Sequence, residues 1–259
     1  MEIFLQPDTW GALVTLTFLE IVLGIDNIIF ISIAANKLPE NQQKKATNIG
    51  LFLAMVLRIL LLFGISLLIA MNSPFFNIDL SLFKAGVTGQ ALILFAGGIF
   101  LLYKSTKEIH HKVEGYAEDE TDGKPKKGYT LTQAIIQITL INIVFSFDSI
   151  LTAVGMTNGI EGAMVIMITS VVLSMVIMML FANPVGKFVS KHPTIQMLGL
   201  SFLILIGFML IAEGAHLSHA TLFGEEIGSI PKAYLYFAIT FSLVVEMLNM
   251  KMRGNSKKH

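Results

Sequence analysis

The sequence contains no cysteine, which excludes disulfide bonds, thiolate metal sites and thiol nucleophiles. Charge is also scarce: only 14% of the 259 residues are Asp, Glu, Lys or Arg, whereas about a quarter of a soluble domain is charged. The sequence has no P-loop and no basic cluster interleaved with aromatic residues, so neither ATP hydrolysis nor nucleic-acid binding is expected. Hydrophobic residues make up 54% of the chain, and its mean hydropathy is +0.72. The composition therefore predicts an integral membrane protein.

Seven apolar runs are long enough to span a bilayer, which requires about 20 helical residues to cross roughly 30 Å of hydrocarbon. The breaks between them carry proline, glycine, asparagine and charged residues, which favour turns. The first run lacks a preceding positive region and is too long for a cleaved signal peptide, so we expect it to be retained. The predicted spans are residues 10–35, 49–71, 86–103, 131–156, 162–183, 194–212 and 232–250.

Lysine and arginine are distributed unevenly between the loops. If the N-terminus lies outside, 15 of these residues fall in cytoplasmic loops or the C-terminal tail, against Lys84 and Lys232 outside and Arg58 within a span. Positive residues accumulate on the cytoplasmic side of membrane proteins. We therefore expect the N-terminus outside and the C-terminus in the cytoplasm.

Two hydrophobic segments repeat each other, one in the first predicted span and one in the fourth. They read Glu20-Ile-Val-Leu-Gly-Ile-Asp26-Asn-Ile-Ile and Asn142-Ile-Val-Phe-Ser-Phe-Asp148-Ser-Ile-Leu, and they start 122 residues apart. A charged loop divides the first six spans into two groups of three. Because three is odd, the second group crosses the membrane in the opposite sense. The predicted fold is therefore all-α and membrane-spanning, with a 3+3 inverted repeat followed by a seventh helix. The first repeat, cytoplasmic loop, second repeat and C-terminal segment are expected at residues 1–104, 105–130, 131–213 and 214–259.

Carboxylates inside a membrane span are costly unless compensated, and they mark functional sites by default. The repeated segments supply three carboxylates, two amides and one hydroxyl, which all offer oxygen as the ligand atom. Such hard ligands suit Mg²⁺, Ca²⁺ or Mn²⁺ rather than copper or zinc. The predicted metal ligands are Glu20, Asp26, Asn27, Asn142, Asp148 and Ser149. The simpler alternative is that these groups only pair between helices, with Arg58 as a counter-ion.

The spacing within each repeated segment raises a geometric problem. On a straight helix, residues six apart point about 120° away from each other, so Glu20 and Asp26 would not face one site. An unwound turn would bring them together, and irregular backbone is tolerated at membrane depth where it lines a polar cavity. We therefore expect a break at residues 24–25 and a matching break at residues 146–147.

Other polar positions are candidates for supporting or gating roles. Arg58 lies too deep in its span to reach water easily and is expected to pair with a carboxylate. Glu246 and Asn249 share one face of the last helix and fit either an inner vestibule or simple interfacial solvation. Charges at the helix ends fit gates at the two mouths, although such charges more often only anchor a helix. These helix-end residues are Lys104, Glu108 and Glu213.

Two histidine clusters have a spacing compatible with a regulatory or access site for metal, although exposed histidines are also frequent by chance. The 14 methionines, by contrast, lie mostly in apolar runs and are expected to serve packing and lipid contact. The two clusters are His110, His111 and Glu114, and Glu213, His216 and His219.

Several of these segments strongly resemble the TerC family of integral membrane proteins, in its short form without CBS domains. The resemblance rests on the paired aspartate segments, on Arg58 in Val-Leu-Arg-Ile, and on Val245-Glu-Met-Leu-Asn249, and it extends over nearly the whole chain. It implies a seven-helix protein of the bacterial inner membrane that exports divalent metal ions, with Mn²⁺ as the leading substrate and no permanently bound cofactor. The resemblance also implies that acidic residues of the first and fourth spans are the ligands.

The chain departs from the family pattern at one position. The position of Asn142 is commonly acidic in the family, matching Glu20 in the first repeat. An amide leaves the site one negative charge short, which puts proton coupling at this position or tight divalent binding in doubt.

Three other classes of function are compatible with parts of the sequence. Membrane aspartyl proteases resemble one another in a Gly-x-Gly-Asp segment, but this chain has Leu-Gly-Ile-Asp26. A retinal protein needs a lysine midway along its last helix, but Lys232 and Lys251 lie at the ends. A membrane factor could also assist the metalation or assembly of exported or membrane proteins without transporting metal. We favour a transporter, not an enzyme, with the lipid bilayer and divalent ions as partners; a homo-oligomer is compatible with the sequence.

Overall fold

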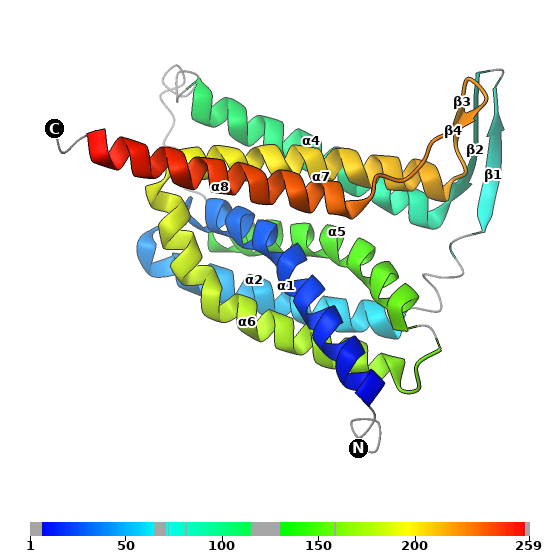
Figure 1. Cartoon of the computed structure of the whole chain (residues 1–259), viewed down its shortest axis with the longest axis horizontal. Coiled ribbons are helices and arrows are strands. Elements are labelled where there is room, and N and C mark those ends of the chain that lie inside the picture. Colours follow the sequence, from blue (N-terminus) through cyan, green and yellow to red (C-terminus); the bar gives the residue numbers. More distant parts are fainter. Residues whose placement is uncertain are drawn as a thin grey trace. The chain divides into compact units, whose positions relative to one another are not determined.

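The computed structural model describes residues 7–64, 71, 73–80, 82–114, 130–157 and 159–256. Within these ranges the chain forms seven helices and one small antiparallel sheet (Figure 1). The helices are α1 (Pro7–Ala35), α2 (Glu40–Phe63), α4 (Gly89–Val113), α5 (Leu131–Thr157), α6 (Ala163–Lys191), α7 (Pro193–Leu217) and α8 (Lys232–Ser256).

The predicted helical membrane fold is confirmed, because each predicted span coincides with one of these helices. Six helices of the described residues are long and apolar enough to cross a membrane, and α1 makes a seventh when its two bent parts count as one span. Several boundaries differ from the prediction: for example, α2 runs from Glu40 to Phe63 where residues 49–71 were expected, and α4 runs from Gly89 to Val113 where residues 86–103 were expected. The inverted repeat and the N-outside orientation stay predictions.

Local sequence signals explain where several helices begin. α5 starts with a capping box, in which Gln133 N donates to Thr130 Oγ1 at 3.2 Å and Thr130 N donates to Gln133 Oε1 at 3.0 Å. Thr88 caps α4, because its Oγ1 accepts a hydrogen bond from Ala91 N at 3.1 Å. α7 begins with Pro193, whose fixed φ and missing N–H suit the first position of a helix.

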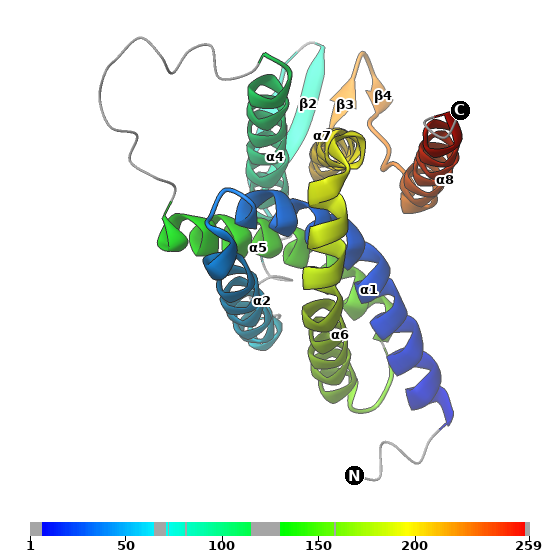
Figure 2. The same ribbon diagram turned by 90° about the vertical axis from the view of Figure 1, so that its left-hand side faces the viewer.

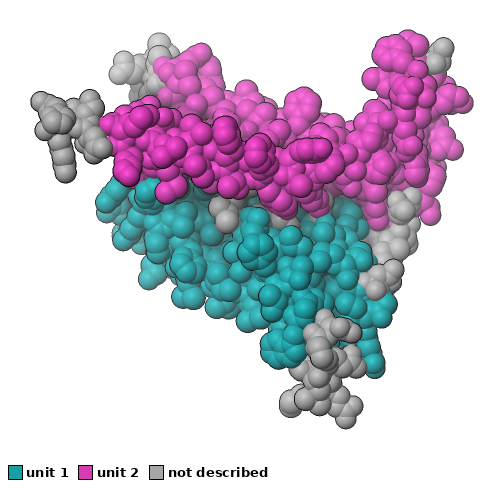
Figure 3. Space-filling view, viewed as in Figure 1, with its two compact units in different colours: residues 1–70, 125–191 teal, residues 71–124, 192–259 magenta. Residues whose placement is uncertain are grey.

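The helices divide into two compact units (Figure 3). Unit 1 covers residues 1–70 and 125–191 and holds α1, α2, α5 and α6. Unit 2 covers residues 71–124 and 192–259 and holds α4, α7, α8 and the sheet. Each unit therefore combines helices from both halves of the sequence. The segments predicted from the repeat follow the order of the chain. The two units instead group helices that pack against one another in space.

In unit 1, helices that are distant in sequence pack side by side. α1 lies along α6 and runs in the same direction (Figures 1 and 2), and a Cβ added to Gly186 would lie 2.9 Å from Ser32 Oγ. α2 lies along α5 in the same way, and a Cβ added to Gly50 would lie 2.5 Å from Ile138 Cγ2. The two helices that carry the repeated segments, α1 and α5, run in opposite directions (Figure 1), as an inverted repeat requires.

In unit 2, α4 and α7 pack antiparallel through small residues. A Cβ added to Gly98 would lie 2.6 Å from Gly207 O, and a Cβ added to Gly207 would lie 3.0 Å from Gly98 O. Two turns further along, a Cβ added to Gly214 would lie 3.2 Å from Ala91 O. Small residues allow helices in a membrane to approach closely, so that van der Waals contact between backbones stabilises the pair.

A four-stranded antiparallel sheet lies at the end of unit 2 where α4 begins and α7 ends (Figure 1). Gly86 N donates to Ser218 O at 2.8 Å, which joins the sheet to the end of α7. The all-α prediction missed this sheet, because its strands are short and lie between long apolar runs. In spatial order the strands are β1 (Pro74–Asp79), β2 (Phe83–Thr88), β3 (Thr221–Leu222) and β4 (Glu225–Glu226).

Replacing Gly207 by leucine is expected to destabilise the protein by about 1–3 kcal/mol through overpacking, because the new side chain would meet the backbone of α4. Thermal unfolding of the purified protein in detergent measures this loss. Gly155→Leu in α5 is the matched control, since no atom lies within 4 Å of a Cβ at that position. An equal loss of stability in both variants would contradict the close approach of α4 and α7.

Candidate functional site

A buried ion pair joins α1 to α2 in unit 1. Glu20 Oε2 pairs with Arg58 Nη1, and each of the two side chains is only 6% exposed. Taking two charges out of water costs several kcal/mol per ion, and this cost is offset only when the charges are well paired. The carboxylate partner that was expected for Arg58 is therefore Glu20.

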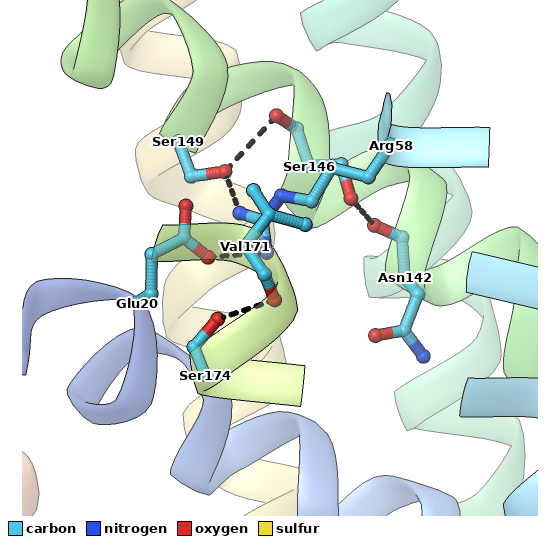
Figure 4. Close-up of polar contacts among 7 residues, drawn as sticks. All are labelled: Glu20, Arg58, Asn142, Ser146, Ser149, Val171 and Ser174. Atoms are coloured by element: carbon cyan, nitrogen blue, oxygen red, sulfur yellow. Dashed lines mark hydrogen bonds and ion pairs between the residues drawn. The ribbon is translucent and has the colours of Figure 1, made fainter. Parts of the chain in front are cut away.

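Arg58 also contacts α5, so one guanidinium links three helices (Figure 4). Its Nη2 donates a hydrogen bond to Ser149 Oγ, and Ser149 Oγ donates to Ser146 O at 3.0 Å. Ser146 Oγ in turn donates to Asn142 O at 2.5 Å. Because residues three and four apart share one face of a helix, these side chains form a buried polar line along α5 that ends at Arg58.

The backbone at the repeated segments bends at one of the two positions where a break was expected. α5 stays helical through residues 146–147, and the serine hydroxyls there bond to carbonyls of their own helix. α1 is also helical throughout, but it bends by 42° between Thr9–Val22 and Asn27–Ala35. The break expected at residues 146–147 is therefore absent, whereas the bend in α1 lies across residues 24–25, where the other break was expected.

The two repeated aspartates, Asp26 and Asp148, belong to the helical backbone of α1 and α5, but their side chains lie outside the described residues. Their role as metal ligands stays a prediction. Among the side chains that the structure does describe, no three His, Cys, Asp or Glu residues gather to hold a metal ion. Of the three carboxylates in the repeat, Glu20 alone has defined surroundings.

Both asparagines of the repeat are buried, with Asn27 7% and Asn142 2% exposed. Asn142 Nδ2 donates to Ile138 O at 2.9 Å within its own helix. Asn27 Oδ1 has no hydrogen-bond partner among the described residues, although it is buried. Buried polar atoms nearly always have a partner, so this oxygen is a candidate ligand, and its role in metal binding stays a prediction.

Two buried serines of α6 contribute further hydroxyl groups that the sequence analysis missed. Ser174 is fully buried, donates from Oγ to Val171 O at 3.0 Å, and lies beside Glu20 in Figure 4. Ser170 is 1% exposed, and its Oγ has no partner in the described part of the chain. Their spacing of four, which places both on one helix face, was the available signal.

The remaining supporting residues lie in unit 2. Lys104 and Glu108 form an ion pair at 3.5 Å, and Glu108 is only 4% exposed, so it is more deeply buried than a helix-end anchor needs to be. Asn249 Nδ2 donates to Glu246 Oε2 at 3.4 Å, as their shared helix face predicts. Glu213 is half-buried near the end of α7. The gating roles of these residues stay predictions.

Neither histidine cluster forms a three-residue metal site in the described structure. His110 Nδ1 lies 3.4 Å from Glu114 Oε2, and His219 Nδ1 lies 3.4 Å from Glu226 Oε1. Each of these histidines therefore pairs with one glutamate on the protein surface. This arrangement agrees with the alternative interpretation, in which exposed histidines occur by chance.

The spans and the buried polar centre define an integral membrane protein with a charged interior. The chain belongs to the TerC family: residues 5–259 match the family described as "Integral membrane protein TerC family". This match confirms the family that the paired aspartate segments indicated.

Named relatives agree with this assignment. The chain is 42% identical to a UPF0053 protein of Haemophilus influenzae, over 96% of both chains. It is 43% identical to the UPF0053 inner membrane protein YgdQ of Escherichia coli, over 95% of this chain and 94% of YgdQ. It is 42% identical over its whole length to the UPF0053 inner membrane protein YoaE of Escherichia coli, but spans only 46% of that longer protein. No solved structure matches the chain.

Removing one partner of the Glu20–Arg58 pair is expected to destabilise the protein by about 3–5 kcal/mol, because a buried charge is left without its partner. The double variant Glu20→Gln/Arg58→Gln should lose less stability than the sum of the two single variants. Unfolding of the purified protein in detergent measures all three losses.

The exposed pair Asp79–Lys84 is the matched control for this comparison of single and double variants. Its side chains are 71% and 62% exposed, and such pairs contribute about 0–1 kcal/mol. Strictly additive losses at Glu20 and Arg58 would show that the two charges do not stabilise each other.

Proposed function

We propose that this protein is a secondary transporter of divalent metal cations, with Mn²⁺ as the leading substrate. The observation that carries the proposal is that the buried Asn27 Oδ1 of the repeat has no hydrogen-bond partner among the described residues, whereas the buried Glu20–Arg58 pair is also what simple pairing between helices would give. The repeat also offers amide and hydroxyl oxygens, which suit hard divalent ions. Asp26 and Asp148 are assigned as the further ligands because of their positions in the repeat.

In this proposal Arg58 is an internal counter-ion that competes with the metal for Glu20. When no metal is bound, the guanidinium neutralises the carboxylate. A divalent cation at Glu20 repels the guanidinium, which keeps a second contact through its hydrogen bond to Ser149 on α5. The carboxylate is then neutralised in both states, by arginine or by metal, so the membrane interior never holds it unpaired.

We further propose that the cation leaves the cell in exchange for protons. In this proposal Asp26 and Asp148 accept protons when the cation departs, because a proton then removes the cost of an isolated anion, whereas Glu20 returns to Arg58. The duplicated segments in α1 and α5 support alternating access, which is common in transporters built from inverted repeats. The four helices of unit 1 would then form the ion-binding part of the cycle.

Metal uptake into proteoliposomes tests this function. Vesicles that contain the purified protein and a metal-sensitive dye are exposed to Mn²⁺, Mg²⁺, Ca²⁺, Fe²⁺ or Zn²⁺, with and without a pH gradient. We expect Mn²⁺ to be transported best, and we expect Glu20→Gln, Asp26→Asn and Asp148→Asn to abolish transport, because each variant removes a negative ligand.

The matched control for this assay is Asp79→Asn, which removes an exposed acid far from any span interior and should leave transport intact. If Asp26→Asn and Asp148→Asn both transport like the wild type, the ligand assignment fails. If the wild-type protein moves none of the five metals, the alternative of a non-transporting factor for metalation or membrane-protein assembly is favoured.

Asn142→Asp adds the carboxylate that the second repeat lacks. We expect this variant to transport at several-fold lower Mn²⁺ concentration, because an additional negative ligand strengthens binding of a hard divalent ion. We also expect a steeper dependence on the pH gradient if position 142 carries a proton. Asn142→Ala, which removes the amide without adding charge, is the control, and equal behaviour of the two variants would show that this position does not contact the ion.

A further inference from the structure

The sheet of unit 2 exposes an unusual number of large apolar side chains. Most of them lie on the edge strand β1 and at the tips of the two hairpins, and each is at least 45% exposed. They are Phe75, Phe76, Leu80, Leu82, Leu222 and Phe223. Large exposed apolar patches in a folded protein mark contact with a partner or with a membrane.

One face of the sheet is apolar. In the β1–β2 pairing, Phe76 lies opposite Val87 and Ile78 lies opposite Ala85. Directly paired residues of antiparallel strands project to the same face, so these four side chains share one surface. Phe76 is 56% exposed, which shows that the protein covers this surface only in part.

The opposite face is polar. Beyond the register irregularity between Pro74 and Phe76, the alternate positions of β1 are Asn77 and Asp79. Asp79 Oδ1 forms an ion pair at 3.0 Å with Lys84 Nζ on β2. Both side chains of this pair are more than half exposed. The pattern is typical of a sheet with one face in water and the other against apolar material.

The apolar face turns toward the ends of the membrane helices. Ala85 packs in a small core with Ala215 of α7 and Phe95 of α4. The strands run across the axes of α4 and α7, and the hairpin tips project beyond the helix ends (Figure 1). If α4 and α7 span the bilayer, a sheet in this orientation would lie along its surface, with the uncovered part of the apolar face toward lipid.

The tip of the β3–β4 hairpin supports the same conclusion. Phe223 and Gly224 have φ values of 54° and 87°, as in a type I′ turn. Asparagine is favoured at the first of these positions, whereas a bulky residue there is strained. Phe223 is nevertheless 73% exposed, and its N–H bonds to Leu82 O at 2.9 Å, which holds the two tips together. An apolar side chain kept in a strained and exposed position indicates a binding role.

We propose that this sheet is a membrane-interface anchor, whose apolar face and two joined tips contact the phospholipid leaflet at the start of α4. Aromatic side chains are favoured at the level of the head groups, and the continuity of the apolar face with the lipid-facing helices identifies the bilayer itself as the partner. The lysine distribution predicts that this is the outer leaflet. The inference does not depend on the transported ion.

Tryptophan fluorescence in vesicles tests this anchor. The chain has a single tryptophan, Trp10, so Trp10→Phe provides the background for Phe76→Trp, Phe223→Trp and the polar-face control Asn77→Trp. The probes are phosphatidylcholine vesicles with bromine on the upper acyl carbons and aqueous iodide. We expect brominated lipid to quench Phe76→Trp and Phe223→Trp with little effect of iodide, and we expect the reverse for Asn77→Trp.

Iodide quenching of all three tryptophans without lipid quenching would overturn the proposal. Shelter of the Phe76→Trp and Phe223→Trp probes from both quenchers would also overturn it, because protein would then cover the face. If a tryptophan variant does not fold, the absence of native cysteine allows Phe76→Cys and Asn77→Cys to be compared in the otherwise unchanged protein. A water-soluble maleimide should then label Asn77→Cys much faster than Phe76→Cys, and equal rates would contradict lipid contact.

Discussion

The interior of a membrane-spanning bundle tolerates a positive and a negative charge only when they neutralise each other, and unit 1 is built around that constraint. Glu20 and Arg58 come from consecutive helices, form an ion pair, and are each only 6% exposed. The second terminal nitrogen of the Arg58 guanidinium donates a hydrogen bond to Ser149, so α5 is attached at the same point. Three of the four helices in this unit are therefore positioned by one side chain, and a metal ion that reaches Glu20 must alter the contact that holds them together.

Hydropathy was sufficient to predict the helices, because a span needs about 20 apolar residues whatever its neighbours are. The same signal does not choose partners, so the pairing of α1 with α6 and of α2 with α5 could not be predicted. Those pairings depend on local features such as Gly186 and Gly50, where a side chain would clash with the facing helix. The sheet escaped prediction because two six-residue strands alternate for too short a distance to stand out beside long apolar runs.

The residue types of the candidate site were predicted better than their arrangement in space. A lone guanidinium inside a span requires a carboxylate, so a partner for Arg58 could be expected from sequence. The choice of Glu20 depends on how α1 and α2 pack. The duplication also suggested matching breaks in both helices. Only α1 changes direction at the expected position, by 42°, whereas α5 is one continuous helix. In α5, Ser146 and Ser149 satisfy their hydroxyls on the helix itself, which gives the backbone no reason to open.

The order of the helices along the chain has a consequence for how the protein enters the membrane. α1 and α2 are consecutive and are joined only by residues 36–39, so these two helices, synthesised one directly after the other, contain both Glu20 and Arg58. A hairpin of these two helices can present a neutral pair to the bilayer before α5 and α6 exist. Each charge inserted alone would cost about 2.5–3.5 kcal/mol at the centre of a span. The Glu20–Arg58 ion pair would thus first lower the cost of inserting two charged residues into the hydrocarbon, and would later connect the helices of unit 1.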